Sequence, residues 1–430
     1  MPFGITPPPQ HTLACHVRRQ PWLTPVMLWL LLAPVLSSDG WAQEAFRASL
    51  AGQAAAEARQ LAAANQRFNL KLGPASFRFR SGLTTEATDN VRNSSDDEEA
   101  DLSVRSLFGV EGVWLVTDRN SLSFSLGVGY SKYLNATEYD GLFVAPGSDL
   151  AFDIYIKDAK LTLYDRFSFS QDVTGDPTVS GIGGLDRFEN AAGLTLMWDL
   201  NKAVIGAGYE YNIFLPTDDL YENQRRSSHL FSTSAALILG TTARAGLQVG
   251  GGFTDYELED YSDNQHISVG PFASVQPSEY LSVRLAGGYV MYFFDPSLSV
   301  PNSEDLDAFY ADLSVNHRLS AVLTHALSVG HQLQAGYLSD SQKLLYARHS
   351  ASWRLFLKTS LQTSLSYEYV EQTREPGEIA NRYGVGLGLT RPLMQRLRGS
   401  LRYQYYFKDS DLENRGYTQN RLVLDLQYSF

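Results

Sequence analysis

The sequence has almost no cysteine and no excess of basic residues. Cys15 is the single cysteine among 430 residues, so a disulfide scaffold or a cysteine-based zinc site within one chain is excluded. The chain has 35 Lys and Arg against 47 Asp and Glu, a net charge of -12. Because general nucleic-acid binders are basic, we expect no nucleic-acid partner.

Long apolar runs are also missing after residue 42. The longest are short, such as 289–294 (YVMYFF) and 235–239 (AALIL), whereas a membrane-spanning helix needs about 20 apolar residues. The mean hydropathy of -0.20 likewise excludes a helical protein with several spans. Charged residues make up only 19% of the chain, which argues against disorder over most of its length.

Residues 1–42 are typical of an export signal. Arg18 and Arg19 precede a 15-residue apolar stretch, Trp22 to Leu36, and a polar region that ends with small residues at Gly40 and Ala42. The alternative is an N-terminal membrane anchor, but the apolar stretch is short for a span and contains Pro25 and Pro34. We therefore predict a signal peptide that is cleaved after Ala42.

The next segment, residues 43–69, is rich in alanine and favours a helix. Its apolar face has only three large residues, Phe46, Leu50 and Leu61, and Glu57 interrupts that face. We predict a short, solvated periplasmic helix or linker here. A coiled coil or a helix that plugs a barrel is the alternative.

From Ala75 onward the hydrophobic period changes to two. In the last strand, one face carries Leu422, Leu424, Leu426, Tyr428 and Phe430, and the other carries Arg421, Val423, Asp425, Gln427 and Ser429. Residues 121–130, 382–389 and 401–408 alternate in the same way. A soluble sandwich would favour Lys, Glu and Thr on its polar face, but Gly, Ser, Gln and Arg predominate here. The pattern predicts residues 70–430 to be an all-β transmembrane barrel with apolar residues facing lipid.

Strand number follows from alternating short turns and long loops. We predict eight turns and nine loops, hence an antiparallel up-and-down barrel of 18 strands, with 16 as the alternative. Longer loops are predicted at 88–101, 138–148, 171–189, 216–228, 257–264, 295–306, 338–342, 372–381 and 409–417. Tyrosine clusters precede many of these loops, which predicts an aromatic girdle at the membrane–water interface.

Two local features do not fit a regular wall. Pro271 lies inside a predicted strand and predicts a bulge there, because proline cannot donate to the ladder. The hairpin around 338–342 predicts His331 opposite His349 on the lipid face, where a polar side chain is costly. Either a register error or a surface covered by a partner would explain the pair.

The two ends of the predicted barrel carry a family resemblance. The terminal alternation that ends in Tyr428 and Phe430 resembles the signal by which outer-membrane barrels are handed to the barrel-assembly machinery. Residues 73–92 run into Asp89, Asn90 and Val91 and resemble the opening strand of outer-membrane β-barrel porins, including those found beside exopolysaccharide genes. The resemblance implies a location in the outer membrane and a pore, and it transfers no binding or catalytic residue.

The face predicted to line the lumen is basic. We assign fifteen basic and seven acidic residues to it, and the basic residues of greatest interest are Arg78, Arg80, Arg284, Arg382, Arg402 and Arg421. In a water-filled pore such a surface favours anions. Alternatively, the charges form internal salt bridges that tie the strands together across a plugged lumen. The sequence leaves both open.

The predicted long loops are acidic, as in Asp96-Asp97-Glu98-Glu99. Such residues are usually just solvated, but divalent cations could also link them to lipopolysaccharide phosphates. Lipid and lipopolysaccharide are therefore expected partners in the outer membrane.

No motif of an enzyme is present. The chain lacks a phosphate loop, an H-E-x-x-H pair and EF-hand spacing, and no acid is placed beside His317 or His349 by the pattern. We expect no catalytic residue, no metal site and no cofactor. The predicted function is passive diffusion of small, anionic solutes. The alternative is a non-conducting barrel that serves polysaccharide export or envelope attachment.

Overall fold

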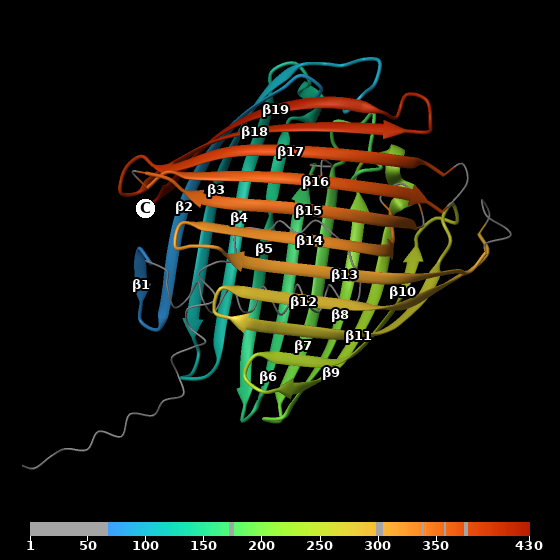
Figure 1. Ribbon diagram of the computed structural model, residues 1–430. Coiled ribbons are helices and arrows are strands. Elements are labelled where there is room, and N and C mark those ends of the chain that lie inside the picture. Colours follow the sequence, from blue (N-terminus) through green and yellow to red (C-terminus); the bar gives the residue numbers. More distant parts are fainter. Residues whose placement is uncertain are drawn as a thin grey trace, which may run out of the picture. The chain divides into compact units, whose positions relative to one another are not determined.

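The computed structural model in Figure 1 describes residues 68–171, 176–297, 304–336, 339, 341–356, 358–373 and 377–430. The predicted signal peptide and all but the last two residues of the predicted helix at 43–69 lie outside the described residues. The strands and the two short 3₁₀ helices have the following bounds: β1 (Leu70–Leu72), β2 (Ala75–Thr88), β3 (Asp101–Leu115), β4 (Ser121–Tyr133), η2 (Thr137–Tyr139), β5 (Gly141–Ile156), β6 (Ala159–Ser170), β7 (Arg187–Asp199), β8 (Ala203–Pro216), η3 (Asp219–Gln224), β9 (Arg226–Leu239), β10 (Ala243–Tyr256), β11 (Asn264–Ser278), β12 (Leu281–Phe294), β13 (Leu306–Arg318), β14 (Leu323–Gln334), β15 (Gln342–Arg354), β16 (Ser360–Gln372), β17 (Ile379–Pro392), β18 (Leu397–Ser410) and β19 (Tyr417–Ser429).

Strands β2 to β19 form a closed antiparallel barrel (Figure 1). Each strand pairs with the next along the chain, and β19 returns to β2 with Arg421 opposite Thr88. The prediction of 18 strands is therefore confirmed, and the alternative of 16 is wrong. Closure leaves no long unpaired edge, which a membrane would not tolerate. No helix among the described residues is long and apolar enough to cross a membrane.

The seam between β19 and β2 has its own closing device. The short strand β1 folds back on β2, with Leu70 opposite Phe77, and so covers the part of β2 that extends past the chain end. The Asn69 side chain donates to the Phe430 carbonyl at 2.9 Å and accepts from the Phe79 N–H at 3.1 Å. One amide thus joins the first and last strands at the point where the ladder ends.

The outer face is apolar and has aromatic residues near both ends. Trp114, Trp198 and Trp353, the three tryptophans among the described residues, are 47–50% exposed and lie near the short turns. At the loop ends, ring contacts join Tyr209 to Phe231 and Tyr367 to Tyr383 across neighbouring strands. Indole and phenol rings favour the two membrane interfaces. A closed barrel with this exterior is suited to the outer membrane.

Glycines on the inner face make room for inward-pointing tyrosines. A Cβ added to Gly193 would lie 2.6 Å from the Tyr164 hydroxyl oxygen, and one added to Gly330 would lie 2.6 Å from that of Tyr346. The Tyr164 hydroxyl donates to Glu210. The alternation of glycine with polar residues on this face therefore reflects close packing of side chains across strands.

Three local expectations are wrong. The predicted loop at 138–148 is largely strand, because β5 begins at Gly141 and continues through a register shift between Val144 and Ser148. Pro271 causes no register shift in the pairing of β11 with β12, and the shift lies between Val275 and Ser278.

The predicted pairing of His331 with His349 is also wrong. His331 faces Leu345, and its ring nitrogen lies 2.8 Å from the Phe309 carbonyl oxygen. His349 faces Leu327 and lies near His325, with ring centroids 5.6 Å apart. The error is therefore in the register of the hairpin, because the loop length predicted for it brings the wrong partners together.

Candidate functional site: the inner face

The six arginines singled out from the sequence all lie on the strand face opposite the exposed apolar residues, but their surroundings differ. Arg78 and Arg80 both approach Glu111, at 3.7 and 3.3 Å. Arg421 donates to Glu86 at 2.7 Å. Arg284 lies over the Phe272 ring, 5.0 Å from its centroid, Arg382 contacts Glu368, and Arg402 is exposed.

One group of enclosed charges, the Glu368 cluster, consists of Arg348, Glu368 and Arg382 on β15, β16 and β17. Arg348 donates to one carboxylate oxygen from Nη2 at 2.6 Å, and Arg382 donates to the other from Nε at 2.7 Å. The Glu368 side chain is 3% exposed. Because one carboxylate serves two guanidinium groups on adjacent strands, the cluster ties three strands together.

Salt bridges engage much of the predicted basic face. Within the described residues, eight of the fifteen assigned basic residues form ion pairs, namely Arg78, Arg80, Lys160, Arg166, Arg348, Arg382, Lys408 and Arg421. Two of their acidic partners, Glu86 and Glu378, are missing from the sequence-based assignment. Glu86 has the same parity in its strand as Arg78 and Arg80, so the period of two is enough to find it.

Arg105 and Arg402 are two inner-face arginines close to the seam, on β3 and β18. Among the described residues, no ion pair involves Arg105 or Arg402. Arg105 donates from Nε to the Ser131 hydroxyl at 3.2 Å and lies over the Phe143 ring. Arg402 faces Val423 across β18 and β19 and borders Gly388. These two guanidinium groups are therefore among the positive charges of the inner face that a solute can meet.

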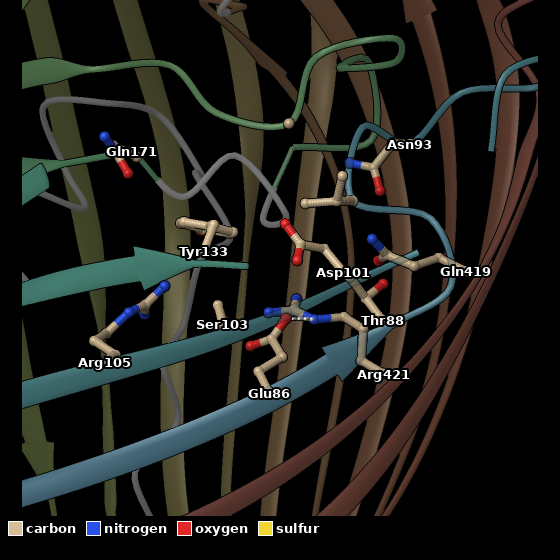
Figure 2. A pocket seen from close by; sticks show the side chains of 12 residues that line it. Glu86, Thr88, Asn93, Asp101, Ser103, Arg105, Tyr133, Gln171, Gln419 and Arg421 are labelled. Atoms are coloured by element: carbon tan, nitrogen blue, oxygen red, sulfur yellow. Dashed lines mark hydrogen bonds and ion pairs between the residues drawn. The ribbon is translucent and has the colours of Figure 1, made fainter. Parts of the chain in front are cut away.

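A pocket lies on the inner face next to the seam (Figure 2). It holds about 510 Å³ of empty space, part of it open to solvent. Its lining comes from β2, β3, β4, β19 and the connections around them, and consists of Glu86, Thr88, Val91, Asn93, Asp101, Ser103, Arg105, Tyr133, Gln171, Gly183, Gln419 and Arg421. Figure 2 shows the Glu86–Arg421 ion pair inside this lining.

One long connection reaches across to the seam. This is the β6–β7 connection, residues 171–186, of which 172–175 lie outside the described part. The buried Lys408 ammonium donates a hydrogen bond of 2.8 Å to the Ser180 hydroxyl in this connection. Lys408 also pairs with Glu378 at 2.6 Å, and both side chains are fully buried. Arg415 donates to Glu378 and to the Thr178 carbonyl. This set, the Lys408 latch, fixes the β6–β7 connection to β18 and to the β16–β17 and β18–β19 connections.

The loop carboxylates crowd one another, as the acidic composition predicted. Burial raises the pKa of Asp263 above its ordinary value, the hydrogen bond from the Tyr256 N–H opposes this rise, and the charges of Asp255, Asp295 and Glu259 add to it. The end of the barrel that carries the long connections therefore has a negative surface at these carboxylates. The inner face, in contrast, carries arginines such as Arg105 and Arg402. No group of three or more potential metal ligands that could hold an ion occurs among the described residues.

The C-terminal residues lie on the outer face near the turn end. Tyr428 and Phe430 are 37% and 48% exposed, and their rings meet edge to face with centroids 5.2 Å apart. The Phe430 N–H donates to the Phe79 carbonyl at 3.2 Å. The last aromatic side chain is therefore presented outward while its backbone is held by the first long strand.

No family model matches the chain, and no curated protein is similar to it in sequence. Among solved structures, it is similar to OccK2 (OpdF) of Pseudomonas aeruginosa, with 14% identity, a TM-score of 0.48, and 84% of this chain and 99% of that chain covered. The structure of OpdK of Pseudomonas aeruginosa with vanillate gives 10% identity, a TM-score of 0.46, and 82% and 99% coverage. A BenF-like porin from Pseudomonas fluorescens Pf-5 gives 12% identity and a TM-score of 0.48, with 84% of this chain and 100% of that chain covered. With similarity this low, the architecture of this chain rests on its own strand pairing.

Proposed function

We propose that the protein is an outer-membrane channel for passive diffusion of small anionic solutes. The observation that carries this proposal is the division of the inner face into arginines tied to carboxylates and arginines left without them. A buried ion pair attracts a passing anion weakly because its charges cancel, whereas an unpaired guanidinium in a water-filled lumen attracts one at close range. Arg105 and Arg402 supply this attraction near the seam.

The opposing charges on the same wall are few. Asp425 lies on the inner face of β19, opposite Ser400 and Thr84, and has no ion pair among the described residues. Glu86 is engaged by Arg421, and Glu111 is shared by two arginines. The wall therefore keeps a positive balance, which favours anions over cations of the same size.

Conductance of the purified full chain in planar bilayers tests the proposal. We expect discrete current steps, and a reversal potential under a KCl gradient that shows preference for chloride. Cation preference would contradict the anionic part of the proposal. Folded barrel that inserts but stays silent would support the alternative, a structural barrel in polysaccharide export or envelope attachment.

We also propose that Tyr428 and Phe430 serve as the assembly signal read by the barrel-assembly machinery. Support comes from their outward, exposed side chains on a terminal strand with alternating apolar residues. Deleting Phe430 is expected to lower the yield of heat-modifiable barrel in the outer membrane and to leave periplasmic aggregate. An unchanged yield of barrel would contradict this role. Asn69→Ala, which removes the backbone clamp but keeps the aromatic side chain, separates loss of the signal from weakening of the seam.

A further inference from the structure

The pocket beside the seam has hydrogen-bonding groups without a partner in the described part of the chain. The amide oxygens of Asn93 and Gln419 are buried, and no described residue donates a hydrogen bond to them. These residues are only 4% and 5% exposed, and both line the pocket. A buried acceptor without a donor costs free energy, so each oxygen favours a ligand or solvent group that can donate to it.

The Asp101 carboxylate in the pocket is already engaged in hydrogen bonds with the backbone. The Asp101 carboxylate accepts hydrogen bonds of 2.6–3.2 Å from the backbone N–H groups of four residues, namely Leu102, Leu134, Asn135 and Ala136. Three of these donors, Leu134, Asn135 and Ala136, belong to the β4–β5 connection. Because its oxygens already accept four hydrogen bonds, Asp101 is a poor partner for an ammonium group.

The remaining charges of the described lining leave one free cation. Glu86 is engaged by Arg421 at 2.7 Å. Arg105 has only the Ser131 hydroxyl and the Phe143 ring as partners in the described part of the chain. In Figure 2 its guanidinium lies on one side of the pocket and the amides of Asn93 and Gln419 lie on the other. The free groups are therefore a cation at one side and neutral acceptors at the other.

We infer that this pocket binds hydroxylated carboxylates, such as linear sugar acids, with the carboxylate on Arg105 and hydroxyl groups donating to Asn93 and Gln419. An amino acid fits less well, because neither carboxylate of the described lining is free to meet its ammonium group. The inference adds a solute class to the proposed function. Binding in the pocket does not depend on that function, whereas transport of the bound solute does.

Binding of three six-carbon probes to the folded full chain in detergent tests the inference by calorimetry. D-gluconate carries the carboxylate and the hydroxyls, hexanoate lacks the hydroxyls, and sorbitol lacks the carboxylate. We expect D-gluconate to bind about tenfold or more tightly than either of the other two, because each of those lacks one of the two kinds of hydrogen-bonding group. Equal binding of D-gluconate and hexanoate, or no binding of D-gluconate, would overturn the inference.

Variants locate the site. Arg105→Gln is expected to weaken D-gluconate about tenfold or more, because it removes the charge that holds the carboxylate. Gln419→Met is expected to bring the affinity for D-gluconate closer to that for hexanoate. Asn93→Asp is the third variant and is expected to weaken D-gluconate binding, because its charge repels the carboxylate. Asp tolerates the positive φ of 54° at this position.

Arg402→Gln is the matched control, because Arg402 is an inner-face arginine without an acidic partner in the described part of the chain and does not line the pocket. It is expected to lower the affinity for D-gluconate much less than Arg105→Gln does, because Arg402 does not line the pocket. If Arg105→Gln and Arg402→Gln lower the affinity for D-gluconate equally, the pocket is not the site. D-gluconate binding by a barrel that stays silent in bilayers would end the proposed channel function while leaving the pocket assignment intact.

Discussion

Arginines occupy the inner face of the barrel in two regions, and they pair with a carboxylate in one region but not in the other. In the Glu368 cluster, Arg348 and Arg382 share one carboxylate that is 3% exposed. Around the seam, Arg105 and Arg402 face the interior without an acid among the described residues. The same residue type at the same strand parity thus ties strands in one region and is left for solutes in the other. What separates the two regions is whether a carboxylate on a neighbouring strand lies within reach, since such a carboxylate cancels the charge of the arginine.

The largest expected effect is on stability, from Glu368→Gln. The variant leaves two guanidinium groups facing a neutral amide in a buried position, so we expect the free energy of unfolding to fall by about 3 kcal/mol or more. Urea unfolding in detergent, followed by heat-modifiable mobility on gels, measures it. Glu86→Gln, which leaves one partly exposed arginine instead of two, is expected to cost less. Equal losses of unfolding free energy in Glu368→Gln and Glu86→Gln would show that the shared carboxylate contributes no more than the simple pair.

Lys408→Met is expected to have the next largest effect, on the loop end. It removes the ammonium group that joins Ser180 to Glu378 and leaves Glu378 with Arg415 as its partner. The β6–β7 connection should then be cut faster by added protease, and current noise should rise if the connection narrows the channel. Lys343→Met, at a partly exposed pair with Glu371, is the control. Unchanged cleavage would show that the Lys408 latch does not hold the connection.

Arg402→Gln should separate selectivity from stability. We expect the preference for chloride to fall severalfold, while the free energy of unfolding changes by less than about 0.5 kcal/mol, because no ion pair is broken. Reversal potentials and urea unfolding of the same preparation measure both. Arg382→Gln is expected to do the opposite, since its partner Glu368 is buried. A loss of stability in Arg402→Gln would place it among the strand-tying residues.

The smallest effect concerns salt. Raising KCl from about 0.1 to about 1 M shortens the screening length from roughly 10 to roughly 3 Å. We expect the preference for chloride over potassium to weaken, because Arg105 and Arg402 attract permeating chloride through water. The loss of stability in Glu368→Gln should change little, since those charges are enclosed. Anion preference that is independent of salt would indicate direct contact with each permeating ion.

The period of two was sufficient to predict much of the fold. Alternation of apolar and polar residues in strands such as 421–430 fixed which side chains face lipid, and turn residues gave the strand count that the pairing confirms. Where local turn chemistry was ambiguous, prediction failed. The loop expected at 138–148 became strand, and the hairpin of β14 and β15 placed His331 opposite Leu345 instead of His349.

The sequence by itself determined the barrel and the face of each arginine, because both depend on a local repeat. It did not determine which arginines are neutralised, because the partners meet only through register and closure. Arg421 pairs with Glu86, 335 residues away, across the seam. Lys408 reaches Ser180, 228 residues away, through the β6–β7 connection. Charge pairing between distant segments depends on the closed ladder, so only the tertiary structure separated the strand-tying arginines from those that face the lumen.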